Sequence, residues 1–359
     1  MALFGSTVNG ADKISIRETT EDGEKLVHME NNFYEAIFVP EKAIFPLTYK
    51  FKASDKDMLV RLPTIAEGIA RGDGIQLCMP WVGDSKRRVQ SNGLLRSADW
   101  TIATSSDDNT ATLTAKTSIT YNDPVSSNPA TLNFSILIKG TAKDSGVVME
   151  YNIVNSGESA ANLMFVAHSR PAPESEYKDG DYLATNGDKC WVGDYKWESL
   201  TAAEVKPHSC TKWPIKGADE FFHVKQEDKK GEYVYAFIPA DWMIVGNGTT
   251  RNFLLYHASP FKISNKEETA KQFFCILKRE HDYLVEVGLS QELDAAYWEE
   301  PGAVVKLHPA ASLDFSLTIA GGNGLNKADA SAITSIKDGK INFKDAEGKE
   351  KCISLGANK

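Results

Sequence analysis

The chain of 359 residues has only five cysteines, and no two of them are close together in the sequence. An odd, dispersed set of thiols is typical of reduced cysteines, so we expect a cytoplasmic protein without disulfides. It also argues against a zinc site, which needs clustered ligands, so we expect no metal. The cysteines are Cys78, Cys190, Cys210, Cys275 and Cys352.

Long apolar runs are missing as well. No stretch approaches the roughly 18 apolar residues of a membrane span. The first residues, MALFGSTVNGADK, lack the basic region and the apolar core of a signal peptide, so we expect neither a membrane partner nor secretion. A diffuse net charge of −9 argues against nucleic acid as the main partner, although it leaves room for a local basic pocket.

Helical periodicity is scarce, and only Pro63–Ala70 and Glu267–Lys271 are predicted to form a turn or two of helix. Short alternating segments separated by turns dominate instead, which predicts an all-β fold, a sandwich or a barrel. The dipeptide Asp338-Gly339 predicts the last hairpin. The predicted strands are Lys13–Glu18, Lys25–Met29, Ala36–Phe38, Thr48–Phe51, Trp100–Thr104, Thr110–Thr120, Ala130–Lys139, Gly146–Asn152, Ala161–His168, Tyr233–Ile238, Arg251–Ala258, Gln272–Lys278, Tyr283–Gly288, Val304–His308, Ser312–Ala320, Ala332–Lys337 and Lys340–Lys344.

The segment Ala70–Ile102 is broken by glycine and proline at short intervals and carries aromatic and basic side chains between the breaks. Such a segment suits a concave polar site better than a plain core. Aromatic faces can cover the C–H side of a sugar, and arginines can hold hydroxyl or anionic groups. Core packing for the aromatics and surface ion pairs for the arginines are the competing interpretations. The candidates are Trp81, Trp100, Arg71, Arg96 and the triplet Lys86-Arg87-Arg88.

The same segment resembles the galactose mutarotase-like (aldose 1-epimerase) family, and most closely its hexose-6-phosphate mutarotase branch. RGDGIQLCMPWVG resembles the Arg-Gly-Gly-Ile-Pro and Pro-Trp-Phe-Gly segments of that branch, with Asp73 inserted or substituted. NGLLRSADW resembles its His-Gly-Phe-Ala-Arg segment and the tryptophan that follows, with Asn92 in place of the histidine. The resemblance implies a large antiparallel β-sandwich over residues 1–320. Residues 321–359 match nothing in the family and are expected to form a small C-terminal β appendage.

Two further residues are candidates for proton transfer. His168 ends an apolar strand and has a side chain whose unperturbed pKa is about 6.5. Glu286 lies among apolar strand residues, a setting that raises the pKa of a carboxyl group. From the residues alone, a half-buried structural histidine and an outward-facing glutamate are the better interpretations. The resemblance reverses both, because the family has a general acid after an Asn-x-Gly turn, here Asn155-Ser156-Gly157, and a base in a late Val-Glu segment.

The resemblance implies an aldose 1-epimerase acting on a hexose or a hexose 6-phosphate, with Glu286 as base and His168 as acid. Arg71, Arg96 and Asn92 would bind the sugar, with Trp81 and Trp100 as platforms. Ring opening and closure by proton transfer needs no cofactor. Glu299 and Glu300 are the fallback bases, and Asp219 and Asp228 are loose candidates for the pocket aspartate of the family.

Asn92 is the main departure from the family pattern, because an amide cannot carry a proton as the family histidine can. A carbohydrate-binding protein without epimerase activity therefore remains the alternative, and different sugar chemistry on the same fold is a third possibility.

Overall fold

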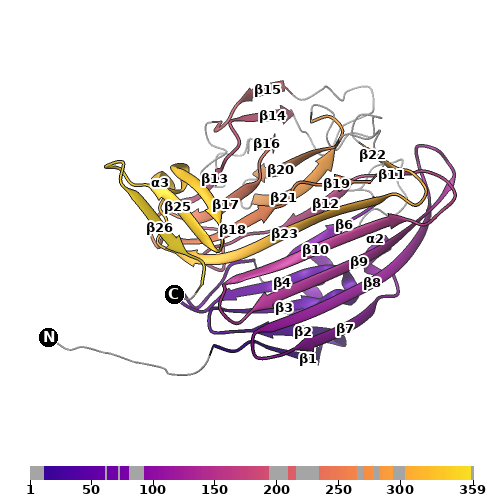
Figure 1. The fold of residues 1–359 in the computed structure, drawn as a ribbon, viewed down its shortest axis with the longest axis horizontal. Helices are drawn as coiled ribbons and strands as arrows, with labels where there is room; N and C mark the ends of the chain where they lie inside the picture. The colour runs from indigo at the N-terminus through magenta and orange to yellow at the C-terminus, as the bar shows by residue number, and fades with distance from the viewer. Residues whose placement is uncertain are drawn as a thin grey trace, which may run out of the picture.

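The computed structural model describes residues 12–60, 63–71, 73–80, 93–193, 209–215, 234–264, 270–278, 283–293 and 304–356. Within these ranges nearly all regular structure is antiparallel β-sheet, so the predicted all-β class is confirmed. Two large sheets pack face to face, and a small three-stranded sheet lies at one end (Figure 1).

The first large sheet has twelve strands among the described residues, in the order β1-β2-β3-β4-β6-β12-β21-β20-β16-β14-β15, with β5 paired to β4. The two halves of the chain meet at its centre, where β12 pairs with β6 on one side and with β21 on the other. The strands are β1 (Ser15–Glu21), β2 (Glu24–Glu30), β3 (Tyr34–Val39), β4 (Ile44–Phe51), β5 (Lys56–Asp57), β6 (Ile75–Cys78), β12 (Phe165–Ser169), β14 (Lys189–Gly193), β15 (Ser209–Lys212), β16 (Val234–Ile238), β20 (Lys271–Lys278) and β21 (Tyr283–Ser290).

The second sheet has nine strands in the described ranges, in the order β13-β17-β18-β23-β10-β9-β8-β7, with β19 paired to β23. Its longest strands follow strict alternation: Ala111, Leu113 and Ala115 of β8 are buried, and the residues between them are not. The strands are β7 (Thr101–Ser106), β8 (Thr110–Asn122), β9 (Pro129–Thr141), β10 (Gly146–Asn155), β13 (Asp181–Thr185), β17 (Trp242–Asn247), β18 (Asn252–Ala258), β19 (Lys262–Ile263) and β23 (Ser312–Asn323).

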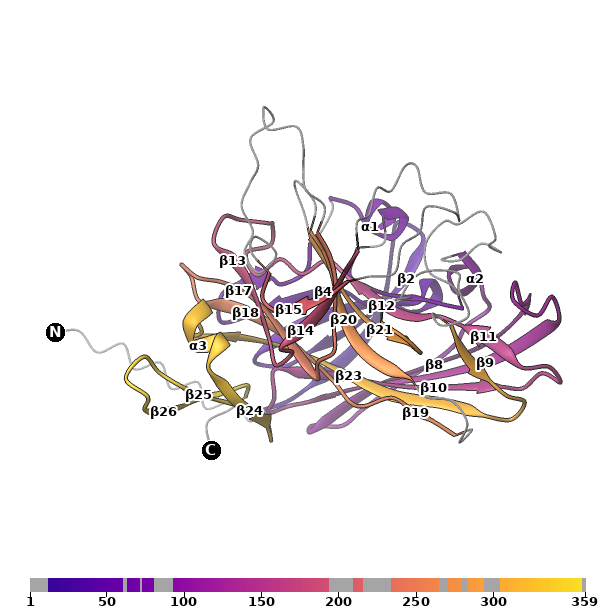
Figure 2. The ribbon, with the colours of Figure 1, turned by 90° about the horizontal axis from the view of Figure 1, so that it is seen from above.

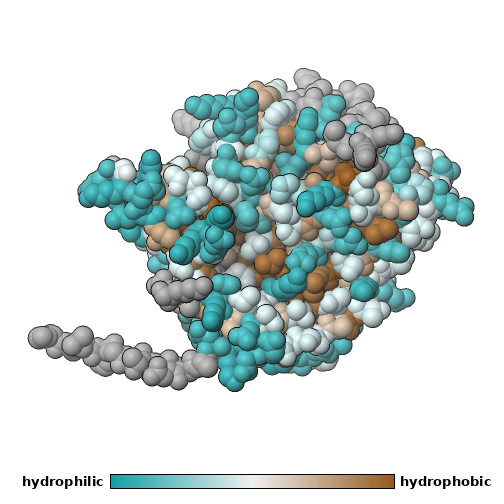
Figure 3. Space-filling view, in the orientation of Figure 1, coloured by the Kyte–Doolittle hydropathy of each residue, from teal (hydrophilic) through white to brown (hydrophobic). Residues whose placement is uncertain are grey.

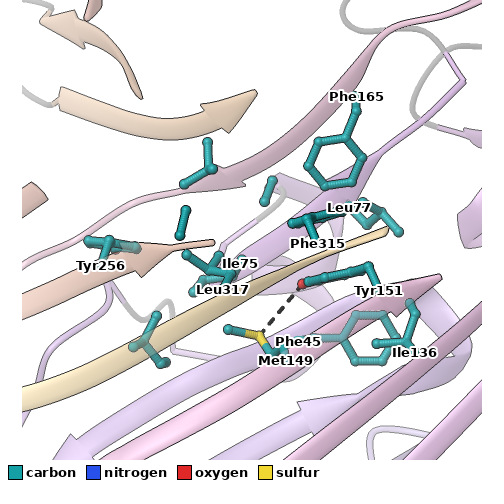
Figure 4. Packing of buried hydrophobic residues seen from close by; sticks show 14 of the residues in the cluster. Phe45, Ile75, Leu77, Ile136, Met149, Tyr151, Phe165, Tyr256, Phe315 and Leu317 are labelled. Atoms are coloured by element: carbon teal, nitrogen blue, oxygen red, sulfur yellow. Dashed lines mark hydrogen bonds between the residues drawn. The ribbon is translucent and has the colours of Figure 1, made fainter. Parts of the chain in front are cut away.

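The core fills the space between the two sheets. Tyr151 of β10 stacks on Phe315 of β23 with ring centroids 4.5 Å apart, and Phe165 of β12 meets Phe315 edge-on at 4.3 Å. Figure 4 shows these rings pointing toward one another, with Ile75 and Leu77 of β6 in the same cluster. Odd-numbered residues of β6 and β12 therefore face the core, and the even-numbered residues project from the other face of the twelve-stranded sheet.

Short helices and a two-stranded ribbon complete the fold. Figure 2 shows α1 and α2 on the side of the twelve-stranded sheet that faces away from the nine-stranded sheet. These elements are η1 (Pro40–Lys42), α1 (Ile65–Arg71), α2 (Gly93–Arg96), α3 (Lys327–Ser331), β11 (Ala161–Leu163) and β22 (Val305–Leu307). The helical turn predicted over Pro63–Ala70 is confirmed as α1. The one at Glu267–Lys271 is wrong at its end, because Lys271 begins β20 and pairs with Ser290 of β21; residues 265–269 lie outside the described ranges.

The C-terminal strands β24 (Ile333–Lys337), β25 (Lys340–Lys344) and β26 (Glu350–Ser354) form the small sheet. The predicted hairpin at Asp338-Gly339 is confirmed, with both residues at positive φ and Lys337 opposite Lys340. The small sheet and α3 share an apolar cluster with β13, β17 and β18, and the outer surface over the small sheet is hydrophilic (Figure 3). The division expected at residue 320 falls inside β23, which continues to Asn323.

Candidate active site

Three polar residues stand side by side on the outer face of the twelve-stranded sheet. In the strand register, His168 of β12 is directly opposite Glu286 of β21 on one side and Gln76 of β6 on the other. Directly opposed residues project from the same face of a sheet. Their chain neighbours Ile75, Ala167 and Val285 belong to the core cluster, so the polar row faces away from the core.

His168 and Glu286 are in direct contact. The distance from His168 Nδ1 to Glu286 Oε1 is 2.7 Å. Side-chain exposure is 19% for the imidazole and 6% for the carboxyl group, so the pair is partly shielded from water. An ionised carboxylate can only accept hydrogen bonds, which places a proton on Nδ1 and leaves Nε2 as the second reactive nitrogen. The structure thus joins the two candidates for proton transfer by a hydrogen bond.

Arg96 approaches the same row from α2. One of its terminal nitrogens, Nη2, donates to Gln76 Oε1 at 2.5 Å. Burial lowers the pKa of the Arg96 guanidinium, with an opposing effect of the Cys78 thiol. Among the described residues Arg96 has no carboxylate partner. A partly buried guanidinium is stabilised by an anionic group or several oxygen atoms nearby.

Trp100 supports this part of the site. Its indole N–H donates to the carbonyl oxygen of Leu95 in α2 at 2.8 Å, and its ring meets Phe45 edge-on at 6.0 Å. The ring packs against the main core cluster, so Trp100 fixes the position of α2 and of Arg96 at its end. Its role as a sugar platform stays a prediction.

Arg71 is the last residue of α1 and is exposed. Its side chain forms no hydrogen bond or ion pair with another residue in the described ranges. The structure therefore brings His168, Glu286 and Arg96 together through Gln76, and leaves Arg71 at the edge of the same outer face as part of the α1 surface. The other sequence candidates lie outside the described residues: Trp81, Lys86, Arg87, Arg88, Asn92, Asp219, Asp228, Glu299 and Glu300.

Sequence reasoning did not single out Gln76, Arg170 or Cys78. Arg170 follows β12 two residues after His168, and its Nη1 is 3.7 Å from Oδ1 of the fully buried Asp73. Burial raises the pKa of the Cys78 thiol to about 12, with the charge of Glu286 adding to the effect, so this cysteine is neutral. Alternate residues of a strand lie on one face, so counting two residues on from His168 would have identified Arg170. Gln76 and Cys78 could be identified only once the pairing of β6 with β12 was known.

Several N–H donors in this region have no acceptor among the described residues. Three nitrogen atoms are buried without a hydrogen-bond partner in the ranges that the structure describes: Gln76 Nε2, Arg96 Nε and Arg170 Nε. Leaving a buried donor unsatisfied costs about 1–3 kcal/mol, so a cluster of such groups calls for an explanation. All three are donors, and an oxygen-rich ligand would supply acceptors for them.

Other features of the structure lie elsewhere. A surface hollow of about 530 Å³ on the nine-stranded sheet is lined by residues of β7 to β10, including Lys116, Asn133 and Asn152, and contains none of the candidate site residues. In the described part of the chain no group of three or more His, Cys, Asp or Glu could hold a metal ion. Within the same ranges, none of the helices combines the length and the apolar character needed to cross a membrane.

Comparison with known proteins bears on the fold. No family model matches the sequence, and no curated protein matches it by sequence. Solved structures do match. A galactose mutarotase-like protein from Clostridium acetobutylicum has a TM-score of 0.60 at 12% identity, over 87% of this chain and 99% of its own. A provisionally named aldose 1-epimerase from Klebsiella pneumoniae subsp. pneumoniae has a TM-score of 0.61 at 11% identity, over 89% and 85%.

A third such structure, from Escherichia coli K12 and also provisionally named an aldose 1-epimerase, has a TM-score of 0.54 at 10% identity, over 87% of this chain and 100% of its own. Identities this low define the fold and leave activity open. The molecule is thus an all-β sandwich protein with a polar His-Glu pair on one sheet. More specifically, it has the fold of the galactose mutarotase-like superfamily.

Proposed function

We propose that the protein is an aldose 1-epimerase, an isomerase that interconverts the anomers of a hexose or a hexose 6-phosphate. The observation that carries the proposal is the 2.7 Å contact between His168 Nδ1 and Glu286 Oε1 on a sheet of a mutarotase-like fold. One group can accept a proton and the other can donate one, at adjacent points on one surface. That is what ring opening of a cyclic sugar requires.

The proposed reaction moves two protons. The Glu286 carboxylate takes the proton from the anomeric hydroxyl, and the C1–O1 bond becomes a carbonyl. The bond between C1 and the ring oxygen breaks, its electron pair stays on the ring oxygen, and His168, which starts as the imidazolium, gives that oxygen its Nε2 proton. Rotation about C1–C2 presents the other face of the aldehyde, and the reverse transfers close the ring. Each group ends in its starting protonation state, so the cycle needs no cofactor.

In this proposal Arg96 binds substrate oxygen atoms beside the pair, with Arg71, Asn92, Trp81 and Trp100 as further binding residues. Two observations support a binding role for Arg96. Its Nη2 donates a hydrogen bond to Gln76, which is directly opposite His168, and it has no carboxylate partner among the described residues. We propose a phosphorylated substrate because the chain resembles the hexose-6-phosphate branch and because Arg96 supplies a positive charge beside His168. A cytoplasmic location, and a division into residues 1–320 and 321–359, belong to the same proposal.

The second candidate function is carbohydrate binding without turnover. The observation that favours it is Asn92, which stands where the family pattern has a histidine. An asparagine can hold a sugar oxygen but cannot exchange a proton with it.

Exchange NMR and polarimetry distinguish the two functions. Fresh α-glucose 6-phosphate, α-glucose and α-galactose would be followed with and without protein. Anomer interconversion faster than in buffer, and lost in His168→Gln and Glu286→Gln, supports the epimerase. Calorimetric binding of one of these sugars without acceleration supports the binding protein. Neither acceleration nor binding for any of the sugars rules out both.

A further inference from the structure

The side-chain amide of Gln76 is held in one orientation. Gln76 is 2% exposed, and its Oε1 accepts the hydrogen bond from Arg96 Nη2 at 2.5 Å. A guanidinium has only donors, so the amide atom that faces Arg96 must be the oxygen. The NH₂ group therefore points away from Arg96, and within the described part of the chain this Nε2 atom has no hydrogen-bond partner.

This amide stands next to the proposed acid. Gln76 and Glu286 are the two residues directly opposite His168 in the strand register, so the imidazole lies between an amide and a carboxylate on one face. Directly opposed residues have Cβ atoms about 4.5–5.5 Å apart. A ligand in contact with His168 is therefore within reach of the Gln76 side chain.

A purely structural role does not account for this residue. Its strand neighbours Ile75 and Leu77 point into the core, whereas Gln76 points to the outer face with an unsatisfied donor. An apolar side chain there would avoid the cost of about 1–3 kcal/mol for that donor. The family pattern that this segment resembles, Arg-Gly-Gly-Ile-Pro, has proline after the isoleucine, and proline has no side-chain donor. Gln76 is thus a feature of this chain that the resemblance does not explain.

We infer that Gln76 is a substrate-binding residue that determines specificity in the His168–Glu286 site. Its Nε2 donates a hydrogen bond to an oxygen of the sugar, either a hydroxyl group or the ring oxygen, beside the atom that His168 protonates. Arg96 locks the amide so that the donor, and not the carbonyl oxygen, meets the ligand. The inference rests on the proposed function and adds a neutral hydrogen-bond donor to the proposed site. This donor would select for one sugar oxygen whether or not the sugar carries a phosphate.

The test pairs changes in the protein with changes in the sugar. Gln76→Leu removes the donor, and kcat/KM for anomer interconversion would be measured on whichever of glucose, galactose and glucose 6-phosphate the wild type converts fastest. The same measurement would be made on the monodeoxy analogues and the ring-thio analogue of that sugar. Each analogue lacks one of the oxygen atoms that could accept the hydrogen bond. We expect Gln76→Leu to lose about 10- to 100-fold on the parent sugar and much less on the one analogue that lacks the partner oxygen.

Two further variants separate ligand contact from damage to the sheet. Gln272→Leu is the matched control, because Gln272 is a glutamine of β20 in the same sheet whose Nε2 donates to the Ala240 carbonyl at 3.0 Å. Gln272→Leu should leave the relative kcat/KM values across the parent sugar and its analogues as they are in wild type. Gln76→Glu keeps the shape and an acceptor for Arg96 but loses the donor, so it should show the same selective loss and carries the test if the leucine variant does not fold.

The outcomes are distinct. Equal activity of wild type and both Gln76 variants on every sugar, or an equal loss on every analogue, overturns the role of Gln76 and leaves the epimerase standing. A wild type that accelerates none of these sugars overturns the proposed function, and this inference with it.

Discussion

Gln76 and Glu286 flank His168 on the outer face of one sheet, although the three residues come from strands far apart in the chain. β6, β12 and β21 are neighbours only because the chain returns twice to the centre of the twelve-stranded sheet. The register then places an amide, an imidazole and a carboxylate in one row. A shift of one residue in either pairing would turn one of these side chains toward the core.

The first prediction concerns the proposed acid and base. His168→Gln and Glu286→Gln should each lower kcat for anomer interconversion by about 10²–10⁴-fold, because each removes one proton-transfer group. The double variant should lose little more than the worse single variant, since the two groups act in one cycle. His257→Gln, on β18 of the other sheet, is the matched control and should leave kcat unchanged. Full activity in either site variant would contradict the assigned roles.

The sequence was sufficient for much of the architecture. Alternation in Thr110–Thr120 and Ala130–Lys139 predicted the two long strands, which the structure confirms as β8 and β9 with slightly longer bounds. The strand predicted over Ala161–His168 is divided instead. Its first part, β11, pairs with β22, and its second part, β12, belongs to the twelve-stranded sheet. A continuous apolar run does not reveal that its two ends pair with different partners, because pairing is set by distant segments.

The site was less predictable for the same physical reason. His168 and Glu286 are 118 residues apart, and residue type alone favoured a structural histidine and an outward-facing glutamate. Gln76 lies in the run Ile-Gln-Leu-Cys, where a single polar residue attracts no attention without knowledge of which residue is opposite. Conversely, Trp100 attracted attention as an aromatic, and the structure places its ring against Phe45 and the core.

The second prediction concerns Arg96. Arg96→Ala should raise KM more than it lowers kcat, because a binding group is lost while His168 and Glu286 remain. If the substrate carries a phosphate, the loss should be larger for the phosphorylated sugar than for the free hexose, since a charged hydrogen bond is stronger than a neutral one. Arg96→Lys keeps the charge but not the planar fork, so it should recover only part of the affinity.

Kinetics on both sugars test this assignment, with Arg17→Ala as control. Arg17 belongs to an exposed pair with Glu35 at 3.5 Å on β1 and β3, and its loss should change neither KM nor kcat. An unchanged KM for both sugars in Arg96→Ala would contradict substrate binding by Arg96.

The third prediction separates stability from activity at Asn155, the last residue of β10. Its Nδ2 donates to the carbonyl oxygens of Ser159 and Leu307, each at 2.8 Å, and its Oδ1 accepts from the Gly157 backbone at 3.0 Å. Asn155→Ala should lower the free energy of unfolding by about 1–3 kcal/mol because buried backbone groups lose their partners. Denaturant unfolding measures the loss. We expect kcat at low temperature to stay unchanged, and a selective loss of kcat would place Asn155 in the chemistry instead.

The last prediction concerns pH and the buried Asp181 of β13. Burial raises the pKa of this carboxyl group from 3.8 to about 6, although hydrogen bonds from Asn247, the Lys178 backbone and Tyr283 oppose the effect; the nearby Glu174 adds to it. The folded protein therefore holds a proton on Asp181 between about pH 4 and pH 6 that the unfolded chain has released. The stabilisation from that proton is complete below the unfolded pKa and is lost as pH rises through the folded pKa.

Asp181→Asn has no such proton, so its stability relative to wild type should rise with pH between pH 4 and pH 7. The total change across that window is about 3 kcal/mol, one pKa unit being worth about 1.4 kcal/mol. Urea unfolding at several pH values measures it. Asp107→Asn is an opposite-sign control at lower pH, because backbone N–H groups of Asn109 and Thr110 lower the pKa of the Asp107 carboxyl group below its unfolded value of 3.8. Its stability relative to wild type should fall as pH rises through that range, and its curve should be nearly flat relative to wild type above about pH 5. Parallel curves for Asp181→Asn and wild type would show that Asp181 ionises alike in both states.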